Sequence, residues 1–214
     1  MDPGDFVRRN TVVAAPPLLP EIRLHLAAAI TPIWQASEAS LARDAVPPPF
    51  WAFAWVGGQA LARFLLDHPE EVAGRDVLDF GAGSGLVAIA AAKANAASVI
   101  AAETDPFAAA AIALNAALNG VTIAIVTADI VDRDPAIQIV LAGDVCYERP
   151  MAERVLPWLR RLAARGAVVL IGDPGRAYLP RSGLVERARY MVPTTRELED
   201  RDEKETIVWR LLPG

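Results

Sequence analysis

The stretch of this sequence best suited to chemistry is VLDFGAGSGL, residues 77–86, in which glycines stand at the alternate positions 81, 83 and 85. An apolar strand that turns through glycines into a helix is the place where doubly wound proteins bind ligands. The dinucleotide fingerprint G-x-G-x-x-G would need a third glycine at position 86, which is Leu86, and no GK[ST] follows to make a phosphate loop. The pattern therefore argues against a nicotinamide oxidoreductase and against a nucleoside triphosphate site.

The remaining pattern, D-x-G-x-G-x-G, is the form used for S-adenosylmethionine, and it runs through Asp79, Gly81, Gly83 and Gly85. This cofactor carries no pyrophosphate, and glycines allow the backbone to approach its amino-acid and ribose parts closely. We expect Asp79 to lie near the ammonium group of the cofactor. A helix-capping role explains the same aspartate, because aspartate caps helices well.

Two further acidic residues stand where predicted strands end. Glu103 closes SVIAAE eighteen residues after Gly85, close to the spacing at which an acidic residue hydrogen-bonds a ribose diol. Asp129, in VTADI after the following strand, is expected at the adenine edge. Together with the glycine loop, these residues predict a cofactor site for S-adenosylmethionine.

The elements that must position these residues alternate along the chain. Five apolar runs predict strands, and helical spacing predicts the helices between and before them. The strands are expected at 76–80, 98–103, 121–127, 137–143 and 167–172, and the helices at 54–67, 86–95, 106–119 and 150–165. Such alternation predicts a parallel sheet covered on both faces. The alternating runs 183–192 and 204–212 predict a terminal antiparallel hairpin, with the charged run 196–203 as a solvated turn.

Length and composition favour a single domain over residues 1–214, because 53% of the residues are hydrophobic and can fill a sizeable core. Residues 1–45 are predicted to be an N-terminal helical extension, with an amphipathic stretch at 21–43 that breaks near Pro32. The net charge of -5 offers no general attraction to polyanions. Nucleic acid is therefore not expected as a partner.

Cysteine and histidine usage gives no sign of a metal site. Cys146 is the single cysteine, and His25 and His68 lie far apart in the sequence, so neither a disulfide nor a metal ion is expected. The start MDPGDFVRRN does not read as a signal peptide, and no apolar run is long enough to cross a membrane. We expect a cytoplasmic protein without a membrane partner.

Three other stretches narrow the class: FWAFAWVGGQAL at 50–61, AGDVCYE at 142–148 and LIGDPGRAYLPRSGL at 170–184. With DFGAGSG and ETDP they resemble the seven-β-strand, or class I, protein lysine methyltransferases, most closely the branch that methylates the β subunit of electron transfer flavoprotein. The resemblance runs from about residue 47 to the C-terminus. D-x-x-Y and G-D-P-G-R are more specific than the glycine loop.

The resemblance implies an α/β class I methyltransferase fold, which is Rossmann-like, with a mostly parallel seven-stranded sheet, helices on both faces and a C-terminal antiparallel hairpin. It places D-x-x-Y beside the methyl donor and facing the substrate lysine, which carries over to Asp144 and Tyr147 with Glu148 as their neighbour. It places Trp51, beside Trp55, over the donor, although core packing also explains these tryptophans. Arg176 fits either a surface position or a contact with an acidic substrate.

Residue chemistry supports the same roles. A substrate lysine arrives as an ammonium and must lose a proton before its nitrogen attacks, and a carboxylate such as Asp144 can bind and orient it. We therefore predict an S-adenosylmethionine-dependent lysine N-methyltransferase that acts on the electron transfer flavoprotein β subunit. The alternatives are another protein lysine, on a ribosomal or chaperone protein, and a non-catalytic partner protein that binds S-adenosylmethionine.

Overall fold

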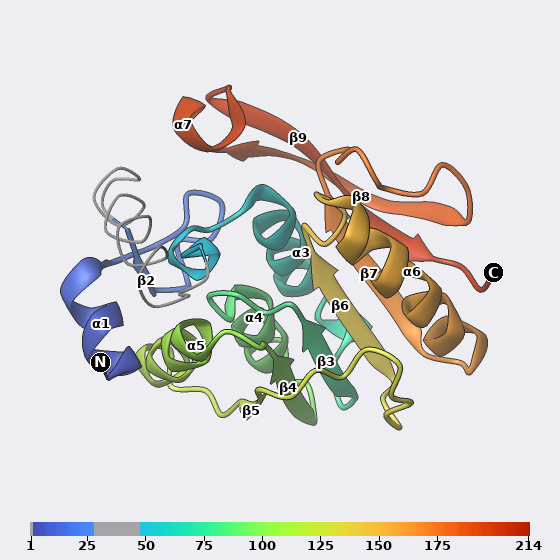
Figure 1. The fold of residues 1–214 in the computed structure, drawn as a ribbon, viewed down its shortest axis with the longest axis horizontal. Coiled ribbons are helices and arrows are strands. Elements are labelled where there is room, and N and C mark those ends of the chain that lie inside the picture. Colours follow the sequence, from blue (N-terminus) through green and yellow to red (C-terminus); the bar gives the residue numbers. More distant parts are fainter. Residues whose placement is uncertain (1, 28–47) are drawn as a thin grey trace.

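The structure, a computed structural model, describes residues 2–27 and 48–214 and is built around a seven-stranded sheet of order β5-β4-β3-β6-β7-β9-β8 (Figure 1). The first five strands in this order are parallel, and β9 pairs antiparallel with both β7 and β8. The strands are β3 (Asp76–Phe80), β4 (Ser98–Ala102), β5 (Ala124–Val126), β6 (Ile139–Gly143), β7 (Val168–Asp173), β8 (Leu184–Pro193) and β9 (Glu203–Leu211). The predicted parallel sheet and terminal hairpin are confirmed.

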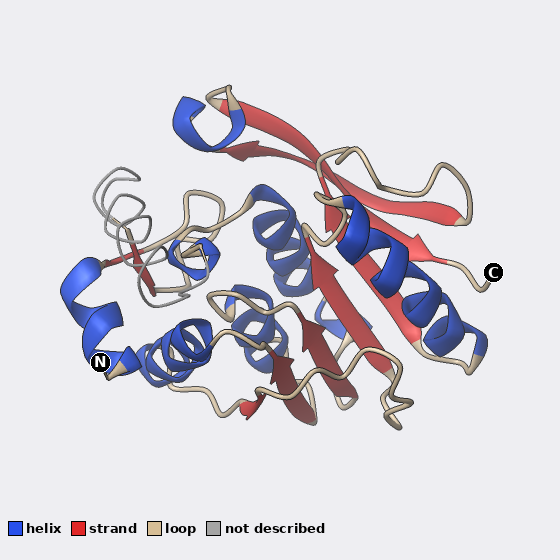
Figure 2. Cartoon of the chain, viewed as in Figure 1, coloured by secondary structure: helices blue, strands red, loops and turns tan. Residues whose placement is uncertain are grey.

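Helices cover both faces of this sheet, as Figure 2 shows. One face carries α3 (Val56–Asp67), α4 (Leu86–Lys93) and α5 (Pro106–Leu118), and the other carries α6 (Arg149–Ala164). Short helical turns lie at η1 (Phe50–Ala52), η2 (Pro69–Glu71) and α7 (Arg196–Glu199). All four long helices were predicted, because their apolar spacing is regular over at least two turns.

Successive side chains along each buried strand point to opposite faces of the sheet, so they pack in two different cores. On β3, Val77 packs among the residues of α3 and α4, whereas its neighbour Leu78 packs in the core that contains Trp158 of α6. On β6, Leu141 and Ala142 divide between the same two cores. Because both faces are apolar, these strands read in the sequence as continuous apolar runs.

The N-terminal segment differs from its prediction. It contains α1 (Pro3–Asn10) and a small antiparallel pair, β1 (Val12–Ala14) with β2 (Leu24–Leu26). The predicted helix at 21–43 is therefore wrong at its start, where β2 lies, and its remainder from residue 28 falls outside the described residues. Tertiary contacts explain the difference: the β2 backbone N–H of His25 donates to the buried amide oxygen of Asn115 at 2.8 Å.

The charged run at 196–203 also differs from its prediction as a solvated turn. It forms α7 at the tip of the hairpin, visible in red at the upper left of Figure 1, and Glu199 within it is buried. A carboxylate is buried in proteins when it is paired, and Glu199 pairs with Arg176. The charged run therefore contributes a buried ion-pair partner, Glu199, as well as exposed charged side chains.

Within residues 2–27 and 48–214, no helix is long and apolar enough to span a bilayer. The same described residues hold no group of three or more His, Cys, Asp or Glu side chains arranged to take a metal ion.

Candidate active site

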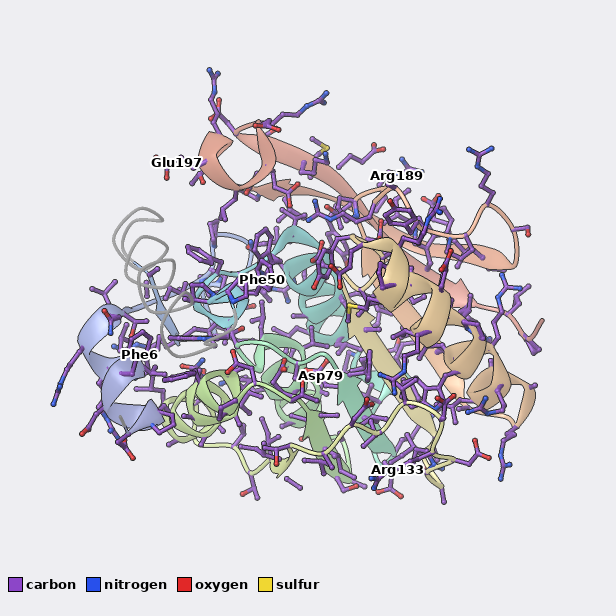
Figure 3. All side chains as sticks on the ribbon, viewed as in Figure 1. Phe6, Phe50, Asp79, Arg133, Arg189 and Glu197 are labelled. Atoms are coloured by element: carbon purple, nitrogen blue, oxygen red, sulfur yellow. The ribbon has the colours of Figure 1, made fainter. Side chains whose placement is uncertain are left out.

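A cavity of about 820 Å³ opens beyond the carboxyl ends of β3, β4 and β6. Asp79, near the centre of the molecule in Figure 3, lies at its base. The predicted site residues that line the cavity are Trp51, Asp79, Gly81, Gly83, Glu103, Asp129, Asp144, Tyr147 and Glu148. Gly85 is not among the lining residues. A volume of this size suits a small-molecule cofactor together with a side chain of a second substrate.

One side of the cavity, here the glycine-loop side, consists of the loop 81–85 with Asp79 and Glu103. The three glycines have φ values of 64°, 51° and 78°, a left-handed region that favours glycine. Gly85 also needs to lack a side chain, because a Cβ there would approach Ile112 to 3.2 Å. The alternate glycines thus turn the chain from β3 into α4 without side chains between the backbone and the cavity.

Asp79 is the penultimate residue of β3, just before this turn. Its Oδ2 accepts the backbone N–H of Ala88, in the first turn of α4, at 2.9 Å, so it caps the helix as well as lining the cavity. Burial raises the pKa of Asp79 to about 8, despite the Ala88 bond, which lowers it. The alternative helix-capping role is therefore present in the structure, in the same residue that reaches the cavity.

Glu103 bridges the loop and the next helix. One carboxylate oxygen accepts the N–H of Gly83 at 3.0 Å and the other accepts the N–H of Asp105 at 3.1 Å. Asp129, in contrast, is half-exposed at the cavity rim and pairs with Arg154 at 2.7 Å. On the glycine-loop side, the two inner carboxylates are thus held by backbone N–H groups.

A second part of the cavity lining, here the arginine side, consists of Asp144 and Arg176, with Glu199 buried outside the lining and paired with Arg176. Asp144 follows β6 with φ of 55°, a conformation that aspartate tolerates better than most residues. Its Oδ2 accepts the N–H of Gly58 at 3.1 Å, and its Oδ1 accepts from Nη2 of Arg176 at 2.8 Å. Burial raises the pKa of Asp144, and the Arg176 charge opposes that rise.

Close backbone packing makes this arrangement possible. The start of α3 lies directly against the ends of β6 and β7, where Gly57, Gly58, Gly143 and Gly172 meet. A Cβ on Gly57 would lie 2.3 Å from the Gly172 oxygen and 2.5 Å from Oδ2 of Asp144. The helix N-terminus, which favours negative charge, therefore points its free N–H at Asp144.

Arg176, whose role the sequence left open, links two carboxylates. Its Nε and Nη2 donate to Asp144, and its Nη1 and Nη2 donate to Glu199. Glu199 was not predicted as a site residue, and its place in a charged run gave no signal of burial. Arg176 itself lines the cavity.

Aromatic rings form the wall between the two sides. Tyr147 packs edge to face against Phe50, with ring centroids 5.8 Å apart, and burial raises the pKa of Tyr147. Trp51 lines the cavity and also packs against Phe6 of α1, so it serves the core and the site together. Trp55 stacks edge to face with Phe50 at 5.9 Å, and Glu148 lies exposed at the rim.

Asn115 is a second residue that sequence reasoning missed, because nothing local marks it within the predicted helix 106–119. It is fully buried within α5, and its amide donates to the Ser84 carbonyl in the glycine loop at 2.8 Å. Its oxygen accepts from β2, so it ties the loop to the N-terminal segment. Asn119 does terminate α5, as predicted.

Comparisons with known proteins cover the two sides of the cavity unequally. The family model described as ribosomal protein L11 methyltransferase (PrmA) matches residues 60–145, which end before Tyr147 and Arg176. The electron transfer flavoprotein beta subunit lysine methyltransferase of Xenopus laevis is 36% identical over 219 residues, which cover 99% of this chain and 87% of that protein. This second match therefore includes the whole arginine side.

Solved structures show the fold. Ribosomal protein L11 methylase from Lactobacillus delbrueckii subsp. bulgaricus superposes with a TM-score of 0.52 at 22% identity, covering 75% of this chain and 81% of that one. Magnesium protoporphyrin IX methyltransferase (ChlM) from Synechocystis PCC 6803, solved with bound SAM, gives 0.55 at 20% identity, covering 73% and 80%. The class I methyltransferase fold expected from the sequence is thus confirmed.

Proposed function

The chain belongs to the electron transfer flavoprotein β subunit lysine methyltransferase family, and from this premise we propose that it methylates lysine side chains of that subunit with S-adenosylmethionine. The observation that carries the proposal is the cavity itself, which joins the glycine loop to a buried carboxylate, Asp144. One side suits a methyl donor, and the other suits the cation that receives the methyl group.

The glycine-loop side fits the donor in size and in chemistry. Gly81 and Gly83 expose backbone to the cavity, and Glu103 reaches the same surface with a carboxylate that can turn from its N–H partners to a ribose diol. Asp79 lines the cavity with a carboxyl group whose raised pKa a bound ammonium group would lower, so that it becomes the negative partner of that cation. When bound, S-adenosylmethionine supplies a methyl group made electrophilic by its sulfonium charge.

The arginine side suits the lysine. Asp144 offers a carboxylate to the ammonium and orients the nitrogen, which must lose a proton before it attacks. Tyr147 and Phe50 line the cavity with aromatic rings, and the face of the Tyr147 ring can hold a cation. The protein thus contributes alignment and exclusion of water, and it needs no covalent intermediate.

A methyltransferase that acts on a ribosomal protein is the second candidate, because the family model for the L11 methyltransferase matches residues 60–145. That match covers the glycine loop and Glu103, which serve the donor, and it stops short of Tyr147, Arg176 and Glu199. Substrate choice resides in the loops around a shared fold. The full-length similarity to the flavoprotein enzymes therefore favours the flavoprotein β subunit.

The proposal is tested by incubating the purified chain with S-adenosylmethionine and purified electron transfer flavoprotein, followed by peptide mass spectrometry of the β subunit. We expect methyl groups on β-subunit lysines, and none with the Asp144→Asn variant. Methyl groups on purified ribosomal protein L11 but not on the flavoprotein would support the second candidate. Tight donor binding without transfer to either protein would support a non-catalytic partner.

A further inference from the structure

A guanidinium lies between two buried carboxylates beside the candidate lysine position. Arg176 donates to Oδ1 of Asp144 from Nη2 at 2.8 Å and from Nε at 3.2 Å. It donates to Oε2 of Glu199 from Nη1 at 3.0 Å, and Nη2 also contacts Oε1 of Glu199. The side chains are 20%, 11% and 2% exposed for Arg176, Asp144 and Glu199, so water screens this cluster little.

Separate chain segments deliver the three groups. Asp144 follows β6, and Glu199 stands on α7 in the hairpin that closes the sheet. Arg176 stands in the turn after β7, where Oδ1 of Asp173 accepts the N–H groups of Gly175 and Arg176, each at 2.7 Å. The turn thus has a defined shape, and it aims the arginine back toward the cavity.

This cluster holds more acidic groups than basic groups. Asp144 and Glu199 share one cation, and the carboxyl group of Asp173 lies near Asp144 and Arg176 as well, so acidic groups outnumber the cation in a poorly screened place. The Oδ2 atom of Asp144 already accepts from Gly58, and its Oδ1 already accepts from Arg176. Because Nε and Nη2 of Arg176 both donate to Oδ1, a lone pair on Oδ2 stays open to a lysine ammonium, which would then lie close to the guanidinium and neutralise the excess charge.

We propose that Arg176 and Glu199 are positioning residues that set how tightly Asp144 holds the substrate lysine, a role that rests on the proposed function. The guanidinium occupies Asp144 in the absence of substrate. Glu199 already accepts from Nη1 and Nη2, so its negative charge offsets the guanidinium that would otherwise repel the lysine ammonium. The ammonium then takes the open lone pair on Oδ2 of Asp144.

The test is the steady-state kinetics of Glu199→Gln with the flavoprotein β subunit as the varied substrate and S-adenosylmethionine at saturation. Without the Glu199 charge, the positive charge of Arg176 beside Asp144 is no longer offset and repels the ammonium, so the KM for the protein should rise roughly tenfold, the size of a lost charged interaction. We expect kcat and the Kd for S-adenosylhomocysteine to change by less than about twofold. The matched control is Glu197→Gln on the same short helix, because that side chain points into solvent (Figure 3).

A double variant separates this role from a structural one. Adding Arg176→Gln to Glu199→Gln removes the repelling cation, so the KM should fall back toward the wild-type value. A purely structural pair predicts the opposite, since the second substitution would add to the damage. Thermal unfolding of each variant shows whether the fold is kept.

The outcomes distinguish this proposal from the proposed function. Methyl transfer by the wild-type chain with an unchanged KM in Glu199→Gln would overturn the positioning role and leave the function standing. A double variant whose KM exceeds that of Glu199→Gln would do the same. If the wild-type chain transfers no methyl group to the flavoprotein, both proposals fail together.

Discussion

The two sides of the cavity hold their carboxylates by different means. On the glycine-loop side, within the described part of the chain, Asp79 and Glu103 accept only backbone N–H groups, from Ala88 in one case and from Gly83 and Asp105 in the other. On the arginine side, Asp144 is held by the charged side chain of Arg176 as well as by one backbone N–H.

This difference matters for what each side can do. Backbone N–H groups are fixed by the turn and the helix, so the glycine-loop side is a preformed cradle for a ligand of constant shape. The Arg176 guanidinium, on a long side chain, bonds Asp144 and Glu199 at once, so the charge balance on the arginine side can change when a cation enters. Donor binding and acceptor binding should therefore be separable by substitution.

The largest separation is expected from Asp144→Asn. An amide keeps the shape of the carboxylate but cannot attract the ammonium, so kcat/KM for the protein substrate should fall by about 100-fold or more. The Kd for S-adenosylhomocysteine, measured by calorimetry, should stay within about threefold of wild type. If Asp144→Asn also lost S-adenosylhomocysteine binding, donor binding and acceptor binding would not be separable by substitution.

Gly57→Ala should damage the arginine side through packing. The added Cβ would lie 2.3 Å from the Gly172 oxygen, so α3 must shift from β7, and the free energy of unfolding should fall by about 2–3 kcal/mol. Denaturant unfolding measures this loss. Gly58→Ala is the matched control, because its Cβ meets only Val87 at 3.9 Å, and alanine there should be neutral or stabilising. Equal effects of the two substitutions would contradict the close-packing argument.

Glu103→Gln should act on the glycine-loop side alone. It weakens the hydrogen bonds offered to a ribose, so the Kd for S-adenosylhomocysteine should rise roughly tenfold. At saturating donor, kcat should stay within about twofold of wild type. Glu153→Gln, an exposed residue of α6, is the control. A fall in kcat without a change in donor affinity would show that Glu103 acts on the methyl acceptor and not on the donor.

Asp79→Asn should change how stability depends on pH. The pKa of Asp79 is raised to about 8, so the folded chain keeps a proton that the unfolded chain has lost. The free energy of unfolding of the wild type should therefore fall, through this group, as the pH rises from about 4 to about 8. Asparagine does not titrate, so Tm of the wild type relative to Asp79→Asn should drop by a few degrees between about pH 5 and pH 8. Parallel Tm curves for the two proteins would show that Asp79 ionises freely.

The glycine-loop side could be predicted from the sequence more fully than the arginine side, because its hydrogen bonds join residues that are closer in the chain. The bond from Ala88 to Asp79 spans nine residues, within one strand–turn–helix unit whose glycines and apolar run are visible in the sequence. The bonds of Arg176 span 32 residues to Asp144 and 23 to Glu199, across three loops. Nothing local marks such a partner, so the role of Arg176 stayed open until the structure.

The errors have the same physical origin. Glu199 lies in a run that is polar throughout, and its burial depends on an arginine from another loop. Residues 24–26 belong to the amphipathic stretch 21–43 that predicted a helix. They form β2 instead, where the backbone N–H of His25 donates to Asn115, 90 residues away in the chain. By contrast, β3, β6 and β7 were predicted to within two residues at each end, because their apolar runs are bounded by turns.

The most direct test of the account is the position of the substrate lysine in a crystal structure with S-adenosylhomocysteine and a β-subunit peptide. We expect the lysine nitrogen to lie within hydrogen-bond distance of Asp144, with Arg176 retained by Glu199. A lysine nitrogen bound at Glu103 or at Asp129, with the pair of Arg176 and Asp144 intact, would contradict it.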